Sequence, residues 1–117
     1  MSLAASNLQP DPLGAPASAG QAWRAELRRT LSGLRDLLVA ESPAAYDGWL
    51  AAREARATRE RTLLLRRVAA LRDVVQTASE AVARAEVTRL RGDVDRHRRR
   101  ARDLQWDSVQ LELGGSE

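Results

Sequence analysis

Apolar residues recur at spacings of three and four along most of this 117-residue chain, and this period constrains its fold more than any other feature. Such spacing places side chains on one stripe of an α-helix. A first stripe comprises Trp23, Leu27, Leu31, Leu34 and Leu38. Ser42-Pro43 then interrupts the pattern, because Ser can cap a new helix and Pro is tolerated at its first position. We therefore expect a first helix over about residues 22–41.

The second helical region carries a seven-residue repeat of the coiled-coil type. Its members are Leu50, Ala57, Leu64, Leu71, Ala78 and Ala85, accompanied by Val68, Val75 and Val82. A second series then steps by four and three through Leu90, Val94, His97, Ala101, Leu104, Ser108 and Leu111. The two series are offset by only about 40° between Leu64 and Leu104. One continuous helix from Pro43 to about Leu113 therefore fits both.

The same region can instead turn near residues 76–80. Residues 77–80, Thr-Ala-Ser-Glu, have the Thr-x-x-Glu form of a capping box, although no Gly or Pro supports a turn there. A continuous rod covered by one short helix would leave half of its seam exposed to water unless it dimerised. We favour the turn, which gives an all-α helical hairpin or three-helix bundle, and keep the rod as the alternative. The turn also predicts an aromatic cluster of Tyr46, Trp49 and Trp106.

Both ends of the chain differ from the helical region. Residues 1–20 contain three prolines, two glycines and a single charged residue, Asp11. They offer too little apolar surface to offset the entropy of ordering, so we expect a disordered tail. Two glycines should end the last helix and leave residues 114–117 flexible. The expected organisation is thus a tail (1–20), a single helical domain (21–113) and a flexible end (114–117).

The sequence carries no motif of an enzyme. It has no Cys, no Gly-rich phosphate loop and no EF-hand spacing. The only His, His97, lies on the apolar stripe, where a core or interface role is commoner than catalysis. We therefore expect no catalysis, no metal and no cofactor. Because an 18-residue apolar run and a basic secretory leader are both missing, we also expect no membrane span and a cytoplasmic location.

All nineteen basic residues are Arg, and seven of them lie in residues 89–102. On a helix six of these arginines divide into two arcs that flank the apolar stripe. Arg96, Arg99 and Arg100 form one arc, and Arg91, Arg98 and Arg102 form the other. A phosphate-binding face would gather its charges on one side and interleave aromatic residues. We interpret the basic patch (Arg96, Arg98, Arg99, Arg100 and Arg102) as mainly solvated, with an acidic protein surface or nucleic acid as alternative partners.

The stretch DLQWDSVQLELGGSE at the C-terminus contains the candidate partner site. On a helix Leu111 continues the stripe, whereas Trp106, Val109 and Leu113 fall within about 60° of one another on the opposite face. On a strand Val109, Leu111 and Leu113 would alternate with polar residues. Either structure leaves an apolar surface that the first helix or a partner must cover, and Trp is the residue type most enriched in binding hot spots.

These patterns predict a small soluble helical protein-interaction module, such as an adaptor, a regulatory subunit or a chaperone-like binder. We favour self-association into a homodimer and keep a separate protein partner as the alternative occupant. Trp106, Val109, Leu111 and Leu113 would form its interface. Nucleic-acid association through residues 89–102 is the alternative. Salt dependence separates the two, because phosphate binding weakens steeply with salt and apolar association does not.

Overall fold

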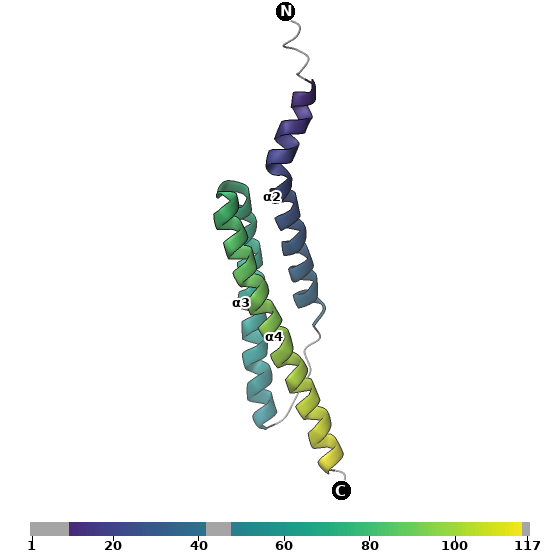
Figure 1. Ribbon diagram of the computed structural model, residues 1–117. Coiled ribbons are helices and arrows are strands. Elements are labelled where there is room, and N and C mark those ends of the chain that lie inside the picture. The colour runs from purple at the N-terminus through teal and green to yellow at the C-terminus, as the bar shows by residue number, and fades with distance from the viewer. Residues whose placement is uncertain (1–9, 42–47, 116–117) are drawn as a thin grey trace, which may run out of the picture.

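The computed structural model describes residues 10–41 and 48–115, and the side chains of residues 20–41 and 48–110. The described residues form three helices and no strand: α2 (Pro10–Val39), α3 (Trp49–Thr77) and α4 (Glu80–Gly115). Helices α3 and α4 make an antiparallel hairpin, and α2 lies along one side of it, parallel to α4 (Figure 1). The all-α hairpin is therefore confirmed, and the continuous rod is excluded.

The predicted stripes form the core where the three helices meet. Each helix contributes four buried residues: Leu27, Leu31, Leu34 and Leu38 from α2, Leu64, Val68, Leu71 and Val75 from α3, and Ala83, Val87, Leu90 and Val94 from α4. Trp23 packs against this cluster while partly exposed. A core of Leu, Val and Ala lets the helices approach closely, and the structure builds a narrow bundle from them.

A two-residue turn joins α3 to α4 within the predicted range of 76–80. Ala78 has extended backbone (φ −87°, ψ 170°), and its N–H donates to the Val74 carbonyl at 2.8 Å. The Ser79 hydroxyl accepts from the Val82 N–H at 3.3 Å, so Ser79 caps α4. The turn therefore satisfies backbone groups at both helix ends without Gly or Pro.

The predicted capping box named Thr77 as the residue that caps the last helix, and this is wrong, because Ser79 caps it. The Thr77 hydroxyl donates to the Asp73 carbonyl at 3.0 Å and thus belongs to the end of α3. The turn also ends the seven-residue repeat, because the chain reverses direction there. Val82 is consequently 51% exposed and Ala85 is exposed, although both were expected on the seam.

The start of α3 also differs from the prediction. It lies at Trp49 rather than Pro43, directly after Gly48, whose φ of 63° is accessible to Gly at little cost. This backbone conformation changes the chain direction, and the helix begins only after it. The predicted cap, Ser42-Pro43, lies outside the described residues.

At the two ends of the chain the helices are longer than predicted. Helix α2 starts at Pro10, and its first turns project beyond the hairpin (Figure 1). Pro16 lacks the N–H that an interior helical residue donates, so this stretch has a weaker intrinsic helix preference than the packed part. Helix α4 continues through Gly115, beyond the predicted end at Leu113. Residues 1–9 and 116–117 lie outside the described residues.

Helix α2 is staggered relative to the hairpin, and this offset decides which surfaces remain exposed (Figure 1). Helix α2 ends at Val39, and Glu41, two residues later, contacts the His97 imidazole. Arg61 of α3 donates to the Leu38 carbonyl at 2.6 Å at the same level. Beyond it, α3 and α4 continue without α2 beside them. We call this part, residues 49–58 and 98–110, the hairpin end.

Replacing Leu71 by Ala should lower the free energy of unfolding by about 2–5 kcal/mol, because it leaves a cavity among three helices. Replacing Arg66, which is exposed on the same helix, should cost less than about 1 kcal/mol. Urea unfolding of the two variants measures both values. Equal losses would contradict the assignment of the buried face.

Removing the Ser79 hydroxyl should destabilise the protein by about 0.5–2 kcal/mol, because the Val82 N–H loses its acceptor. Thr77→Ala is the matched control and should cost less than about 0.5 kcal/mol, since Thr77 is exposed and bonds only within its own helix. Thermal unfolding followed by circular dichroism ranks the two. A larger loss of stability from Thr77→Ala would contradict the assignment of Ser79 as the cap and support the predicted capping box at Thr77.

Candidate functional site

Trp106 and Val109 lie on α4 in the hairpin end and are exposed by 61% and 42%. At about 100° per residue, they lie within about 40° and 20° of the direction of Arg84. Arg84 donates to Glu26 of α2 at 3.1 Å. The two apolar side chains therefore occupy the edge of α4 that α2 covers nearer the turn. Because α2 ends level with His97, it does not cover Trp106. The alternative in which the first helix covers this apolar surface is therefore wrong.

The other two predicted interface residues are described only by their backbone. Leu111 and Leu113 belong to α4, which excludes the strand alternative for this stretch. Their side chains lie outside the described residues.

The hairpin brings Trp49 to the same end as Trp106, as predicted. Arg53 of α3 donates to Asp107 of α4 at 2.7 Å, and Leu50 and Leu104 are buried in this part of the hairpin. The Arg53 guanidinium lies over the Trp49 ring at 5.1 Å from its centroid. Trp49 is nevertheless 57% exposed, so the two Trp residues do not form the closed cluster that we expected. Tyr46 lies outside the described residues.

The basic patch divides between two sides of α4, as the sequence predicts. Arg100 pairs with Glu60 of α3, and Arg96 pairs with Asp93, which also accepts from Arg67 of α3 at 2.6 Å. The hydrogen bond from Arg67, supported by Arg96, holds the pKa of Asp93 below its ordinary value. Two patch arginines are thus engaged with carboxylates on the α3 side.

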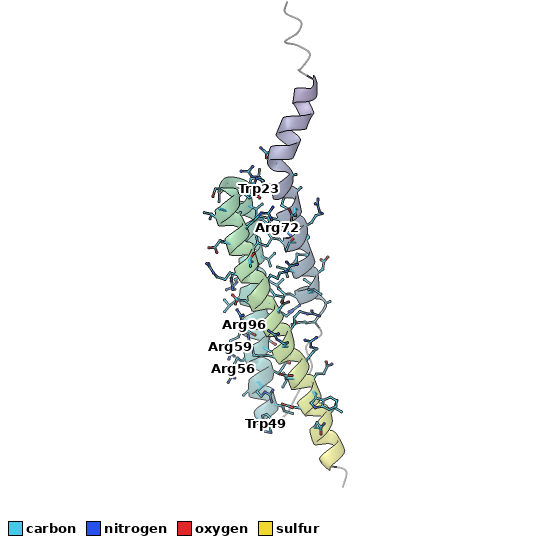
Figure 2. The ribbon with its side chains drawn as sticks, in the orientation of Figure 1. Trp23, Trp49, Arg56, Arg59, Arg72 and Arg96 are labelled. Atoms are coloured by element: carbon cyan, nitrogen blue, oxygen red, sulfur yellow. The ribbon has the colours of Figure 1, made fainter. Side chains whose placement is uncertain are left out.

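The remaining patch residues lie elsewhere on α4. Arg99 and Arg102 are exposed and Arg98 is half-buried. Figure 2 shows Arg56 and Arg59 of α3 and Arg96 of α4 along one stretch of the hairpin, so α3 adds arginines that the prediction did not include. Acidic residues are interspersed among them, and the five predicted residues do not gather on one face.

His97 is the most constrained polar group among the described residues. Its side chain is 1% exposed, as expected for a residue on the stripe. The Nδ1 atom lies 2.6 Å from Oε1 of Glu60 on α3, and Nε2 lies 2.7 Å from Oε1 of Glu41 just after α2. One side chain thus bridges all three helical segments.

Two carboxylates face the two ring nitrogens of His97. A neutral imidazole has one N–H and one lone pair, so it can donate to only one carboxylate. Burial raises the pKa of Glu60, but hydrogen bonds from His97 and Arg100 outweigh burial and leave that pKa below its ordinary value of 4.5. Glu60 is therefore an anion at neutral pH.

Sequence reasoning assigned His97 to the core but missed its partners. Glu60 lies between the seam residues Ala57 and Leu64. A carboxylate at this place in an apolar seam could have indicated a buried polar contact. Glu41 gave no such sign, because it follows the end of α2 and meets His97 only through the tertiary fold. A side chain so buried cannot reach a substrate in this structure, so the cluster functions as a clamp between helices.

A small pocket of about 110 Å³ lies between α3 and α4 in the hairpin end. Its lining includes Arg53, Arg56, Glu60, Arg100 and Asp103. Two of its three arginines are already paired with carboxylates. Pockets that bury a small ligand usually measure about 300–1,000 Å³, so this one offers no enclosed substrate site.

In the described ranges 10–41 and 48–115, no helix contains an apolar stretch able to span a membrane. Within the same ranges, His and carboxylate side chains form no group of three or more suited to a metal ion. Comparisons of the chain with protein-family models, curated proteins and solved structures give no match.

Replacing His97 by Leu should cost about 3 kcal/mol, because the carboxylates of Glu41 and Glu60, which are largely shielded from solvent, lose their hydrogen-bond partner. Adding Glu41→Gln and Glu60→Gln should recover more than half of that loss, since the uncompensated charges are removed. Urea unfolding at pH 7 measures both variants. A triple variant as unstable as His97→Leu would show that lost packing, not charge, causes the effect.

The lowered pKa of Glu60 predicts a loss of stability in acid. Because the folded-state pKa lies below 4.5, ionised Glu60 stabilises the fold above that pH, and the contribution disappears as the pH falls through the folded-state pKa. The difference in unfolding free energy between the wild type and Glu60→Gln should therefore shrink as the pH falls from about 5 toward 3. Asp36→Asn, at the exposed surface of α2, is the control. A difference that persists to pH 3 would contradict the assignment.

Proposed function

We propose that this protein is a helical interaction module that binds another protein through the hairpin end, around Trp106 and Val109. The observation that carries the proposal is the stagger of α2. The edge of α4 that accepts α2 near the turn continues past the end of α2 with Trp106 61% exposed. A third helix packed there would bury Trp106 and Val109 in the way that α2 buries the residues nearer the turn.

The chemistry of the surface supports this role. Trp supplies a large apolar area with few rotatable bonds and is enriched in binding hot spots. Burying exposed apolar area gives about 25 cal/mol per Å², so covering a Trp and its apolar neighbour contributes substantially to affinity. Val109 adds apolar area on the same edge. Of the other exposed apolar residues, Leu63 lies on α3 outside the hairpin end and Val82 lies on α4 next to the turn.

Nucleic-acid association is the second candidate function, and the arginines of α3 and α4 favour it. It accounts less well for the surface, because Arg96 and Arg100 are paired with carboxylates and Arg98 lies on another side of α4. It also leaves the exposure of Trp106 and Val109 unexplained. A module that binds protein explains both features.

The proposal predicts that Trp106→Ala/Val109→Ala weakens association at least tenfold without changing stability by more than about 1 kcal/mol, since both residues are exposed. Light scattering after size exclusion measures the molar mass of the full chain alone and in extract of its own cells. The complex with its partner should persist as salt is raised to 0.5 M.

Leu63→Ala is the matched control, because Leu63 is 57% exposed on α3 outside the hairpin end. Equal loss of association in the control and in the double variant would contradict the proposal. So would a wild-type chain that stays monomeric and free of partners in both samples. Loss of the complex at 0.5 M salt in both the wild type and the Leu63→Ala control would favour nucleic acid as the partner instead.

A further inference from the structure

Four arginines follow one edge of α4, and the spacing of the first three is seven residues. They are Arg84, Arg91, Arg98 and Arg102. At about 100° per residue, all of them lie within about 40° of one direction. This is the edge that faces α2 near the turn and that carries Trp106 and Val109 in the hairpin end. Glu80 and Asp95 lie within the same range of directions, and Glu80 pairs with Arg84. Four arginines against two carboxylates leave this edge, which α2 contacts near the turn, with a net positive charge.

The first of these arginines shows what the edge binds. Arg84 Nη2 donates to Glu26 Oε1 of α2 at 3.1 Å, and this hydrogen bond lowers the pKa of Glu26. Helix α2 ends before it reaches Arg98 and Arg102. Asp95 precedes Arg98 by three residues on this edge, but among the described residues no carboxylate forms an ion pair with Arg98 or Arg102. Beyond the end of α2, the same edge of α4 therefore still carries arginines, Arg98 and Arg102, and apolar residues, Trp106 and Val109.

We propose that the occupant of the hairpin end is an amphipathic helix of a partner protein with an acidic edge. Its apolar stripe covers Trp106 and Val109, and its Asp or Glu residues meet Arg98 and Arg102 as Glu26 meets Arg84. The available length, from residue 98 to 110, is about 18 Å and seats a helix of about 12–14 residues. This inference rests on the proposed function and adds the chemistry of the partner.

A second copy of the chain fits this face less well than an acidic helix. A two-fold interface uses the same patch on both chains, so the net positive charge of this edge would lie on both sides of it. Like charges at an interface disfavour association. An acidic partner removes this repulsion.

The test uses a fluorescent 16-residue helical peptide with Leu at the four-three-four spacing of α2 and Glu on one flank. A matched peptide carries Lys in place of Glu. Fluorescence anisotropy measures the binding of both peptides to the full chain at 50 and 150 mM salt. The Glu peptide should bind at least tenfold more tightly than the Lys peptide, with a smaller difference at the higher salt because of screening.

Arg98→Glu/Arg102→Glu should reverse that preference, so that the Lys peptide binds more tightly. The control Arg59→Glu/Arg66→Glu changes the same charges at exposed positions of α3 and should leave the preference unchanged. Trp106→Ala should weaken both peptides at least fivefold. Circular dichroism confirms that each variant is folded.

The outcomes separate the inference from the proposed function. Equal binding of the two peptides, with dependence on Trp106, overturns the acidic partner and leaves the interaction module standing. Binding that does not depend on Trp106, or no binding of either peptide, contradicts the inference. A wild-type dimer that Trp106→Ala dissociates also overturns it and identifies the occupant as a second copy.

Discussion

The leucine stripe of α2 needs two helices to cover it, and the hairpin of α3 and α4 supplies both. Each helix presents a single line of Leu, Val or Ala to the other two, so none of the three stripes is buried in the absence of its neighbours. The small side chains of α4 at Ala83 and Val87 allow close approach near the turn. The rest of the architecture follows from this shared core, including the direction of α2 and the position at which it stops.

The polar contacts at the end of α2 add specificity to that apolar packing. Leucines at a regular spacing can slide by one turn and still bury similar area, whereas His97 meets Glu41 and Glu60 in only one register. Arg61 contributes similarly through its bond to the Leu38 carbonyl. A buried ion pair is a weak source of net stability but defines a unique arrangement well. The clamp thereby sets how far along the hairpin α2 reaches.

The position of the clamp has a consequence for function. With α2 held at the level of His97, the edge of α4 beyond it keeps Trp106, Val109 and Arg102 exposed and Arg98 half-buried. Near the turn the same edge binds α2 through a combination of apolar packing and the Arg84–Glu26 pair. The interaction proposed for the hairpin end repeats a contact that the molecule already makes within itself.

The sequence by itself determined the helical class, the three apolar stripes and the location of the turn, because helical periodicity is local and survives in any arrangement of the helices. It also determined that the arginines of α4 lie on two sides of the stripe. It did not determine the cap of α4, since both Thr77 and Ser79 are suitable residues and only backbone geometry selects Ser79. Nor did it determine the exposure of Trp106. That depends on where α2 ends relative to α4, which is set by contacts between residues more than 50 positions apart, such as Glu41 with His97. Register between helices is a tertiary property, and here it decides which part of a uniform edge is buried and which is left for a partner.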